Sequence, residues 1–220
     1  MSAKLLNLSS EEVVRRARLY VNELVHYRLQ YPNGGQDPEA KSPFASFGIY
    51  KRVADCIALA LWSEGISRSF DGTDTIPPFP ATPHVNGPSI NCQSLVDEMT
   101  GFKRRKGQPD YPGGRFFKKV TMPRPGDMVV FSGNPHGHIA VITEVPVEAP
   151  LILSVDNWIT RDNGNKKAAL RIVHCSPSNE KRFLGHAVAE TDAWVFRGKG
   201  AHFVHLNREE LLSGNPIKNS

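Results

Sequence analysis

The residues of this 220-residue chain that could carry out nucleophilic chemistry are three cysteines, Cys56, Cys92 and Cys175. They are odd in number, widely spaced and without a CxxC motif, so the sequence indicates neither a disulfide framework nor a thiolate zinc site. A free cysteine becomes a nucleophile when an imidazole takes its proton and a polar group holds that imidazole in place. His138 and Asn157 are residues of these two types.

The two cysteines nearest to helix patterns differ in their expected environment. Cys92 follows the loop GPSIN and is predicted to open a short helix, Cys92–Thr100, where unpaired amides and the helix dipole lower the pKa of a thiol. Its own amide is also placed to help bind an oxyanion. Cys56 is predicted to lie inside a longer helix, residues 48–64, on an apolar face, which is typical of a buried cysteine. We therefore expect Cys92 to be the nucleophile, with Cys56 as the alternative, and Cys175 to be incidental.

The elements that must position these residues centre on the stretch 124–158. It contains three apolar runs rich in β-branched residues, bounded by Pro, Gly, Asn or Asp, which is typical of consecutive antiparallel strands. His138 opens the second run, and Asp156 and Asn157 close the third, so the histidine and the carboxamide are expected to face each other. The three predicted strands are Met128–Phe131, Ile139–Val145 and Leu151–Val155.

Flanking patterns predict the rest of the scaffold. Ser9 and Glu12 have capping-box spacing at the start of a predicted helix of about five turns that ends near Pro32. A proline-rich segment, Ser67–Ser89, is predicted to be a surface excursion beside the substrate cleft. Further strand-like runs are Ala168–His174, Phe183–Val188 and Ala193–Phe196, followed by a helical turn at Arg208–Leu212.

Four motifs, NCQSLV (91–96), PGDMVVF (125–131), GHIAVI (137–142) and DNW (156–158), resemble in order those of the CHAP and NlpC-type cysteine peptidases and amidases. Those are papain-like enzymes that cleave peptidoglycan. The resemblance implies Cys92 as nucleophile, His138 as base and Asn157 as the orienting residue. The chain departs from the CHAP pattern at Val155, where an acidic residue is usual, so Asp156 is an alternative orienting residue. With Cys56 as nucleophile, Asp55-Cys56 would imitate the NlpC-type Asp-Cys start.

The expected fold is α+β and papain-like, with N-terminal helices and a nucleophile-bearing helix packed on a central antiparallel β-sheet. We expect a single domain in which residues 1–66 form an N-terminal helical part and residues 67–220 form the catalytic core. No metal or cofactor is expected, because five histidines show no HExxH or H-x-x-x-H spacing: His84, His174, His186, His202 and His205. His136, two residues before His138, is expected to be a loop residue.

The composition, 40% apolar and 22% charged, is that of a globular domain. The net charge of +5 favours a polyanion weakly, but the basic cluster at 103–106 is short, so no nucleic-acid partner is expected. No apolar run has the roughly 18 residues that a membrane span needs. The first eight residues lack the layout of a secretory signal, so synthesis in the cytoplasm without a signal peptide is expected.

The resemblance implies a cysteine-dependent amide hydrolase that cleaves the peptide stems of peptidoglycan. A cell-wall substrate without a signal peptide predicts delivery by a signal-independent route, as a type VI secretion effector with antibacterial action or as a phage-type lysin. Such a toxin would act in the periplasm of the target cell and would have an immunity protein or a component of the secretion apparatus as partner. The alternatives are a protease, deamidase or transferase acting on a protein in a host cell, and a non-catalytic binding module with this fold.

Overall fold

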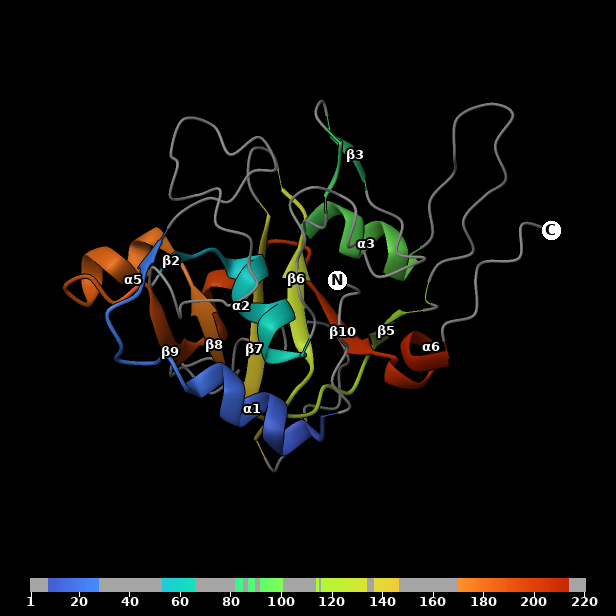
Figure 1. The fold of residues 1–220 in the computed structure, drawn as a ribbon, viewed down its shortest axis with the longest axis horizontal. Coiled ribbons are helices and arrows are strands. Elements are labelled where there is room, and N and C mark those ends of the chain that lie inside the picture. Colours follow the sequence, from blue (N-terminus) through green and yellow to red (C-terminus); the bar gives the residue numbers. More distant parts are fainter. Residues whose placement is uncertain are drawn as a thin grey trace.

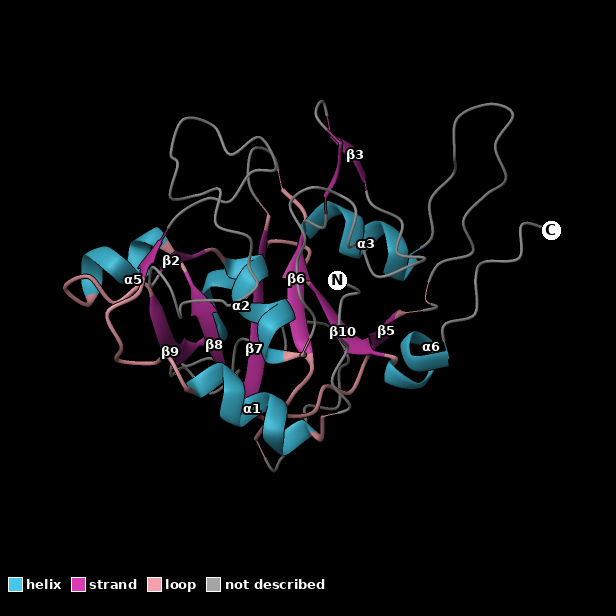
Figure 2. Cartoon of the chain, viewed as in Figure 1, coloured by secondary structure: helices cyan, strands magenta, loops and turns pink. Residues whose placement is uncertain are grey.

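The computed structural model describes residues 8–27, 53–65, 82–84, 87–89, 92–100, 114, 116–133, 137–146 and 170–213. In this part of the chain, helices pack on a six-stranded sheet (Figures 1 and 2). The expected α+β class is confirmed. The expected antiparallel sheet is confirmed too, because every neighbouring pair of its strands runs antiparallel.

The strand order is β5-β10-β6-β7-β8-β9. Strands β6 and β7 are the first two strands of the predicted meander, and Val130 pairs with Ile139 in their register. The strand on the other side of β7 is β8, whereas the predicted strand 151–155 lies outside the described residues. The bounds are β5 Phe117–Val120, β6 Met128–Phe131, β7 His138–Glu144, β8 Arg171–Cys175, β9 Val188–Asp192 and β10 His202–Leu206.

Side-chain alternation gives the sheet two buried faces, because successive residues of a strand point to opposite sides. One face packs with the helices α1 (Ser10–Arg18), α2 (Cys56–Ser63) and α3 (Cys92–Thr100). Its strand residues include Met128, Val130, Ile139, Val141 and Val173. The opposite face packs against the 3₁₀-helix η2, Ala193–Phe196, and includes Val129, Ala140, Ile142, Ile172 and Phe203. Each fully buried Val, Ile, Met or Phe side chain contributes about 1.5–3 kcal/mol to stability, so the packing on both faces stabilises the sheet.

Helix α1, Ser10–Arg18, begins as predicted but is much shorter than predicted. The Glu12 amide donates to Ser9 Oγ at 3.2 Å and so caps the helix. The expectation that the helix continues to near Pro32 is wrong. The chain turns after Leu19, passes Asn22 in a left-handed conformation (φ 68°) and enters the short strand β1, His26–Tyr27.

Helix α2, Cys56–Ser63, starts later than the predicted helix 48–64. The preceding residues form strand β2, Val53–Ala54, which pairs in parallel with β1. Asp55 then caps the helix, because its carboxylate accepts the Ala58 amide at 2.8 Å. Cys56 is therefore the first residue of α2, and the prediction that it lies in the interior of a helix is wrong.

Helix α3, Cys92–Thr100, has the predicted bounds, and α6, Arg208–Ser213, confirms the predicted terminal turn. The strand predicted at 183–188 is wrong: Ser176 caps helix α5, Pro177–Arg182, which begins with a proline, and β9 starts only at Val188. The strand predicted at 193–196 is also wrong, since these residues form η2. Within the proline-rich segment, β3, Thr82–His84, pairs with β4, Gly87–Ser89.

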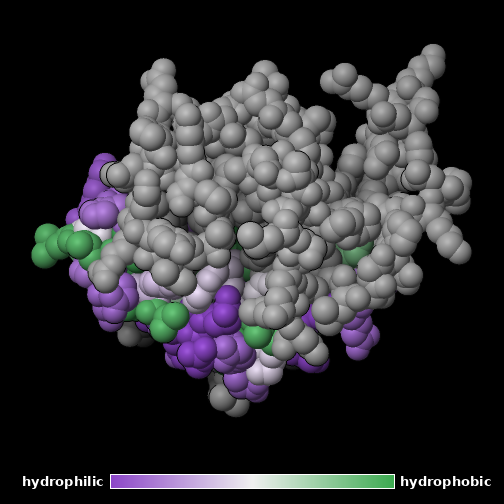
Figure 3. Space-filling view, in the orientation of Figure 1, coloured by the Kyte–Doolittle hydropathy of each residue, from purple (hydrophilic) through white to green (hydrophobic). Residues whose placement is uncertain are grey.

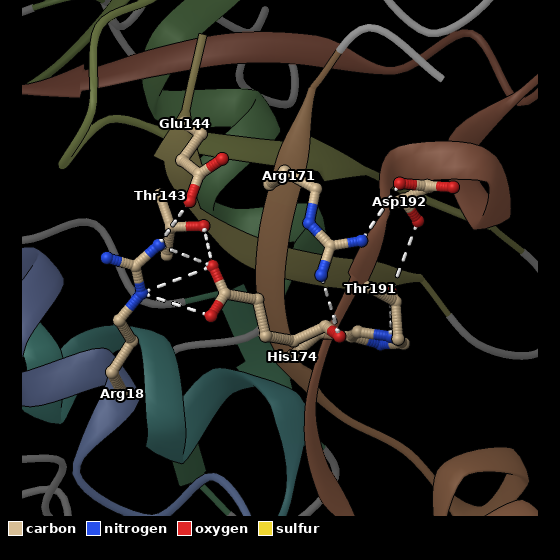
Figure 4. Close-up of polar contacts among 8 residues, drawn as sticks. Arg18, Thr143, Glu144, Arg171, His174, Thr191 and Asp192 are labelled. Carbon is tan, nitrogen blue, oxygen red and sulfur yellow. Dashed lines mark hydrogen bonds and ion pairs between the residues drawn. The ribbon is translucent and has the colours of Figure 1, made fainter. Parts of the chain in front are cut away.

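Helix α1 is tied to the sheet by charged side chains. In the view of Figure 3, hydrophilic side chains gather over α1. The Arg18 guanidinium donates to Glu190 on β9 at 2.7 Å and to Glu144 on β7 at 2.8 Å (Figure 4). Arg18 therefore links the helix to two strands. Glu190 also accepts a hydrogen bond from the Thr143 hydroxyl at 2.6 Å. None of the described helices has the length and apolar character needed to cross a membrane.

Candidate functional site

Two helix N-termini bring two cysteines together. Cys56 opens α2 and Cys92 opens α3, and their side chains hydrogen bond to each other. Both are almost buried, with Cys56 8% and Cys92 7% exposed. A helix N-terminus stabilises negative charge on a nearby sulfur, since its first amides have no acceptor within the helix. Cys56 therefore lies in an environment that favours a thiolate, with Cys92 as its hydrogen-bonding partner.

The start of β7 approaches Cys92 so closely that only glycine fits there. A Cβ atom on Gly137 would lie 2.6 Å from Cys92 Cβ and 2.5 Å from the carbonyl oxygen of Phe131. No real Cβ atom makes such contacts, so the absent side chain is a steric requirement. Gly137 thus places the following residue, His138, beside the two cysteines.

His138 is the first residue of β7, so its ring lies at the end of the sheet, where it can be contacted from both sides. The imidazole hydrogen bonds with the Cys56 sulfur. On its other side, Nε2 lies 2.8 Å from Nδ1 of His174 on β8, which leaves Nδ1 of His138 for the sulfur. The ring also stacks on Phe196 of η2, with centroids 5.4 Å apart and an interplanar angle of 29°. Contacts on several sides therefore fix the orientation of His138.

The strand register explains why the two imidazoles meet. Val141 pairs with Val173, so His138 and His174 point to the same face of the sheet as diagonal neighbours. Their rings are nearly perpendicular, at 85°, with centroids 5.0 Å apart. The pairing of β7 with β8 is therefore sufficient to hold the second imidazole against the first.

The hydrogen bonds of His174 define the proton positions in this pair. Thr191 donates its hydroxyl proton to the carbonyl oxygen of Asp192, so its oxygen is free to accept from His174 Nε2, 3.1 Å away (Figure 4). The amide nitrogen of Asn179 also lies 3.3 Å from His174 Nε2, but its two hydrogens are accepted by the carbonyl oxygens of His174 and Ala187, so it has none left to donate to the ring. We assign the proton of neutral His174 to Nε2 on this basis. Its Nδ1 then accepts the Nε2 proton of His138.

The electrostatics agree with these assignments. The hydrogen bond with Cys92 and the nearby His138 together lower the pKa of Cys56 to about 5, although burial and the charge of Asp55 oppose the shift. Burial, and secondarily the neighbouring His138, lowers the pKa of His174 to about 3, so His174 stays neutral at physiological pH. The site thus holds a thiolate next to one imidazole, and a neutral imidazole behind it.

The structure unites some of the residues predicted from the sequence and adds one. Cys92, His138 and the alternative nucleophile Cys56 lie together. Asn157 and the alternative Asp156 lie outside the described residues. His174 was not predicted as a site residue. The signal in the sequence was a histidine that directly follows the apolar residues Ile172 and Val173 in a strand, where a buried imidazole needs a partner.

Cys175 and Asp127 contribute to the structure and lie outside the proposed site. Cys175 is fully buried at the end of β8, and burial raises the pKa of its thiol well above the ordinary value, so this thiol is unreactive. Asp127 closes the turn before β6, because its carboxylate accepts the Arg124 amide at 2.8 Å, and its other oxygen lies 2.7 Å from His205 Nδ1. Among the described residues, no group of three or more His, Cys, Asp or Glu side chains is arranged to hold a metal ion.

Comparison of the chain with models of known protein families, with curated proteins and with solved structures finds no match. The geometry of the site and the motifs of the sequence are therefore the features that indicate function.

Proposed function

We propose that the protein is a thiol-dependent amide hydrolase in which Cys56 is the nucleophile, His138 the general base and acid, and His174 the residue that orients His138. One observation carries the proposal. The Cys56 sulfur, at the N-terminus of α2, hydrogen bonds with His138, whose other ring nitrogen is held by the neutral His174. A nucleophile, a base and an orienting group in hydrogen-bonding sequence are what acyl transfer requires.

The proposed reaction uses each of these groups in turn. His138 first takes the thiol proton of Cys56 at Nδ1, which leaves Cys56 as the thiolate. The thiolate attacks the carbonyl carbon of the amide, and the carbon–nitrogen bond breaks as His138 gives this Nδ1 proton to the leaving amine. Water then attacks the thioester with His138 as base, and the acid product and the thiolate are released. The amides of Cys56 and Ile57, in the first turn of α2, have no acceptor within the helix and are suited to stabilise the oxyanion.

Cys56 is preferred to Cys92 as nucleophile because of its partners. Cys56 hydrogen bonds both with His138 and with Cys92, and these contacts stabilise its thiolate. Cys92 contributes the S–H donor of the pair. Both cysteines begin a helix, so position in a helix does not separate them. The hydrogen bond between Cys56 and the imidazole is what favours Cys56.

The fold and substrate follow from the resemblance described above. Asp55-Cys56 at the start of a buried helix, packed on an antiparallel sheet whose strand β7 begins with His138, supports a papain-like fold of the NlpC type. We propose the peptide stems of peptidoglycan as the substrate. A role as an antibacterial effector, with an immunity protein as partner, is part of the same proposal.

The test is hydrolysis of purified peptidoglycan, with the new amine and carboxyl ends read by mass spectrometry. Cys56→Ser and His138→Ala are expected to lower the rate by more than about 1,000-fold, because each removes a group that takes part in bond making. Cys175→Ser is the matched control, since it changes a buried cysteine outside the proposed reaction. An active Cys56→Ser variant together with an inactive, folded Cys92→Ser variant would move the nucleophile to Cys92.

A further inference from the structure

Cys56 and Cys92 form a thiol pair, and the mechanism above uses only one of them as nucleophile. We propose that this pair is a redox modification site, at which a hydroperoxide oxidises Cys56 and Cys92 then closes a reversible disulfide with it. The effect on catalysis rests on the proposed function, whereas the formation of the disulfide does not.

The two cysteines are in contact in the folded chain. The Cys56 and Cys92 side chains already hydrogen bond to each other, although they come from two helices that are distant in sequence. Gly137 packs directly against Cys92 and would leave its own Cβ only 3.3 Å from the Cys92 sulfur. Cys92 is therefore held in place by the residue that precedes β7, and its hydrogen bond keeps it in contact with Cys56.

Cys56 is also in the form that reacts with peroxides. Peroxides oxidise thiolates rather than thiols, and Cys56 is stabilised as a thiolate by Cys92 and His138. Cys56 and Cys92 keep a small exposed area, whereas the third cysteine, Cys175, is fully buried. A small oxidant such as hydrogen peroxide is thus directed to the pair and not to Cys175.

The chemistry balances with the peroxide as the only oxidant. The Cys56 thiolate attacks the hydroxyl oxygen of the peroxide, the O–O bond breaks, and the sulfur becomes a sulfenic acid. The other oxygen leaves as hydroxide or alkoxide and takes a proton from solvent to give water or an alcohol. The Cys92 thiol then attacks the Cys56 sulfur. A sulfur–sulfur bond forms, the sulfur–oxygen bond breaks, and the oxygen leaves as water with the thiol proton. Two electrons pass from the sulfurs to the peroxide, and a dithiol reverses the change by thiol–disulfide exchange.

The disulfide would have two consequences. It occupies the sulfur that attacks the substrate, so the oxidised protein is inactive as a hydrolase. It also prevents further oxidation of Cys56 to the sulfinic and sulfonic acids, which dithiols do not reduce. Cys92 would therefore make inactivation by peroxide reversible.

The test begins with the complete, reduced chain treated with hydrogen peroxide. Remaining thiols are blocked under denaturing conditions, and the protein is digested and mapped without reduction by mass spectrometry. We expect a Cys56–Cys92 peptide pair, with Cys175 left as the one free thiol of the three. A map in which Cys56 is bonded to Cys175, or is a sulfinic acid while Cys92 remains a free thiol, overturns the proposal.

Two variants sharpen this test. In Cys92→Ser, peroxide is expected to convert Cys56 into the sulfinic acid, and dithiothreitol is expected not to restore the free thiol. Cys175→Ser, the control, should form the same Cys56–Cys92 disulfide as the unmodified chain. Recovery of the Cys56 thiol in Cys92→Ser to the same extent as in the unmodified chain contradicts the proposal. If Cys92→Ser does not fold, the map of the unmodified chain still decides.

The readouts separate this proposal from the proposed function. The disulfide is detected by mass whether or not the protein cleaves peptidoglycan, so a chain that forms the pair without hydrolysing any amide supports the modification site and contradicts the hydrolase. A chain that hydrolyses peptidoglycan but shows no Cys56–Cys92 pair after oxidation contradicts the modification site alone.

Discussion

The hydrogen bond from Cys92 to Cys56 should be measurable as the acidity of a single sulfur. Cys92→Ala removes the donor that is the largest cause of the low pKa of Cys56, so that pKa should rise from about 5 toward the ordinary value of 9.0. The thiolate would then form at higher pH, and alkylation of Cys56 by iodoacetamide at pH 6 should become slower. The measurement is the rate of Cys56 alkylation against pH, with modified peptides identified by mass.

Cys92→Ser is the matched control, because a hydroxyl can still donate to the Cys56 sulfur. Its alkylation profile should lie between those of the unmodified chain and Cys92→Ala. Identical profiles for all three proteins would mean that Cys92 does not stabilise the thiolate.

His174 is expected to act on the rate through His138 and not by contact with the substrate. In His174→Leu the Nε2 proton of His138 loses its acceptor, so kcat should fall on the order of 10²- to 10⁴-fold, as happens when a catalytic histidine loses its orienting group. KM should change little, because substrate contacts are unaffected. Steady-state kinetics on a soluble peptidoglycan fragment would separate the two constants.

His174→Asn keeps a hydrogen-bond acceptor near His138 and should recover part of the lost kcat. A purely structural role for His174 would instead give a similar loss in both variants, together with a lower melting temperature.

At this scale the sequence predicted the kinds of residue better than their pairing. His138 and the two cysteines were identified because a free thiol, an imidazole and a helix start are visible as residue types. The contact between Cys56 and His138 depends on how α2 packs on the sheet, which no local pattern specifies. His174 was missed because its role arises from the pairing of β7 with β8, two strands whose relative register is a tertiary property.

At the scale of the elements, the N-cap of α2 makes a contribution to stability that can be measured. The carboxylate of Asp55 accepts the Ala58 amide at 2.8 Å, and loss of such a cap costs about 1 kcal/mol, within a range of roughly 0.5–2. Asp55→Ala should therefore lower the free energy of unfolding by about this amount. Denaturant unfolding followed by circular dichroism gives the value directly.

Asp55→Asn separates the cap from the charge. Asparagine caps a helix as well as aspartate, so this variant should keep more stability than Asp55→Ala. Both variants remove a negative charge that raises the pKa of Cys56, so both should shift the alkylation of Cys56 to lower pH. Equal stability of the two variants would show that the cap contributes nothing.

The elements that were predicted correctly are those with a local signal. The strand Met128–Phe131 and the helix Cys92–Thr100 are bounded by turn residues or glycine, and the structure has the same bounds. The prediction of one helix over 48–64 is wrong, because Val53 and Ala54 pair with β1 as a strand and the helix begins only after its cap, Asp55. The helix expected to reach Pro32 failed because the chain leaves the helical conformation after Arg18, despite a favourable apolar periodicity.

At the scale of the whole molecule, the close packing of α3 against the end of the sheet depends on Gly137. A Cβ atom at position 137 would lie within 2.6 Å of both Cys92 Cβ and the Phe131 carbonyl oxygen, so Gly137→Ala must push α3 and the start of β7 apart. We expect a loss of stability of about 1–3 kcal/mol, as for other overpacked sites. We also expect slower alkylation of Cys56 at pH 6, because Cys92 and His138 move together with these elements. Unchanged stability and alkylation would show that the backbone at position 137 accommodates the methyl group without moving Cys92 or His138.

The wide spacing of the four side chains along the chain has a consequence for folding. Cys56, Cys92, His138 and His174 come from two helices and two strands, and each contact closes a long loop. An unfolded chain therefore holds an ordinary thiol, and the thiolate exists only after α2 and α3 have docked beside β7. Ultraviolet absorbance of the thiolate during refolding at pH 7 would time this docking, using the reactive sulfur itself as the reporter of tertiary assembly.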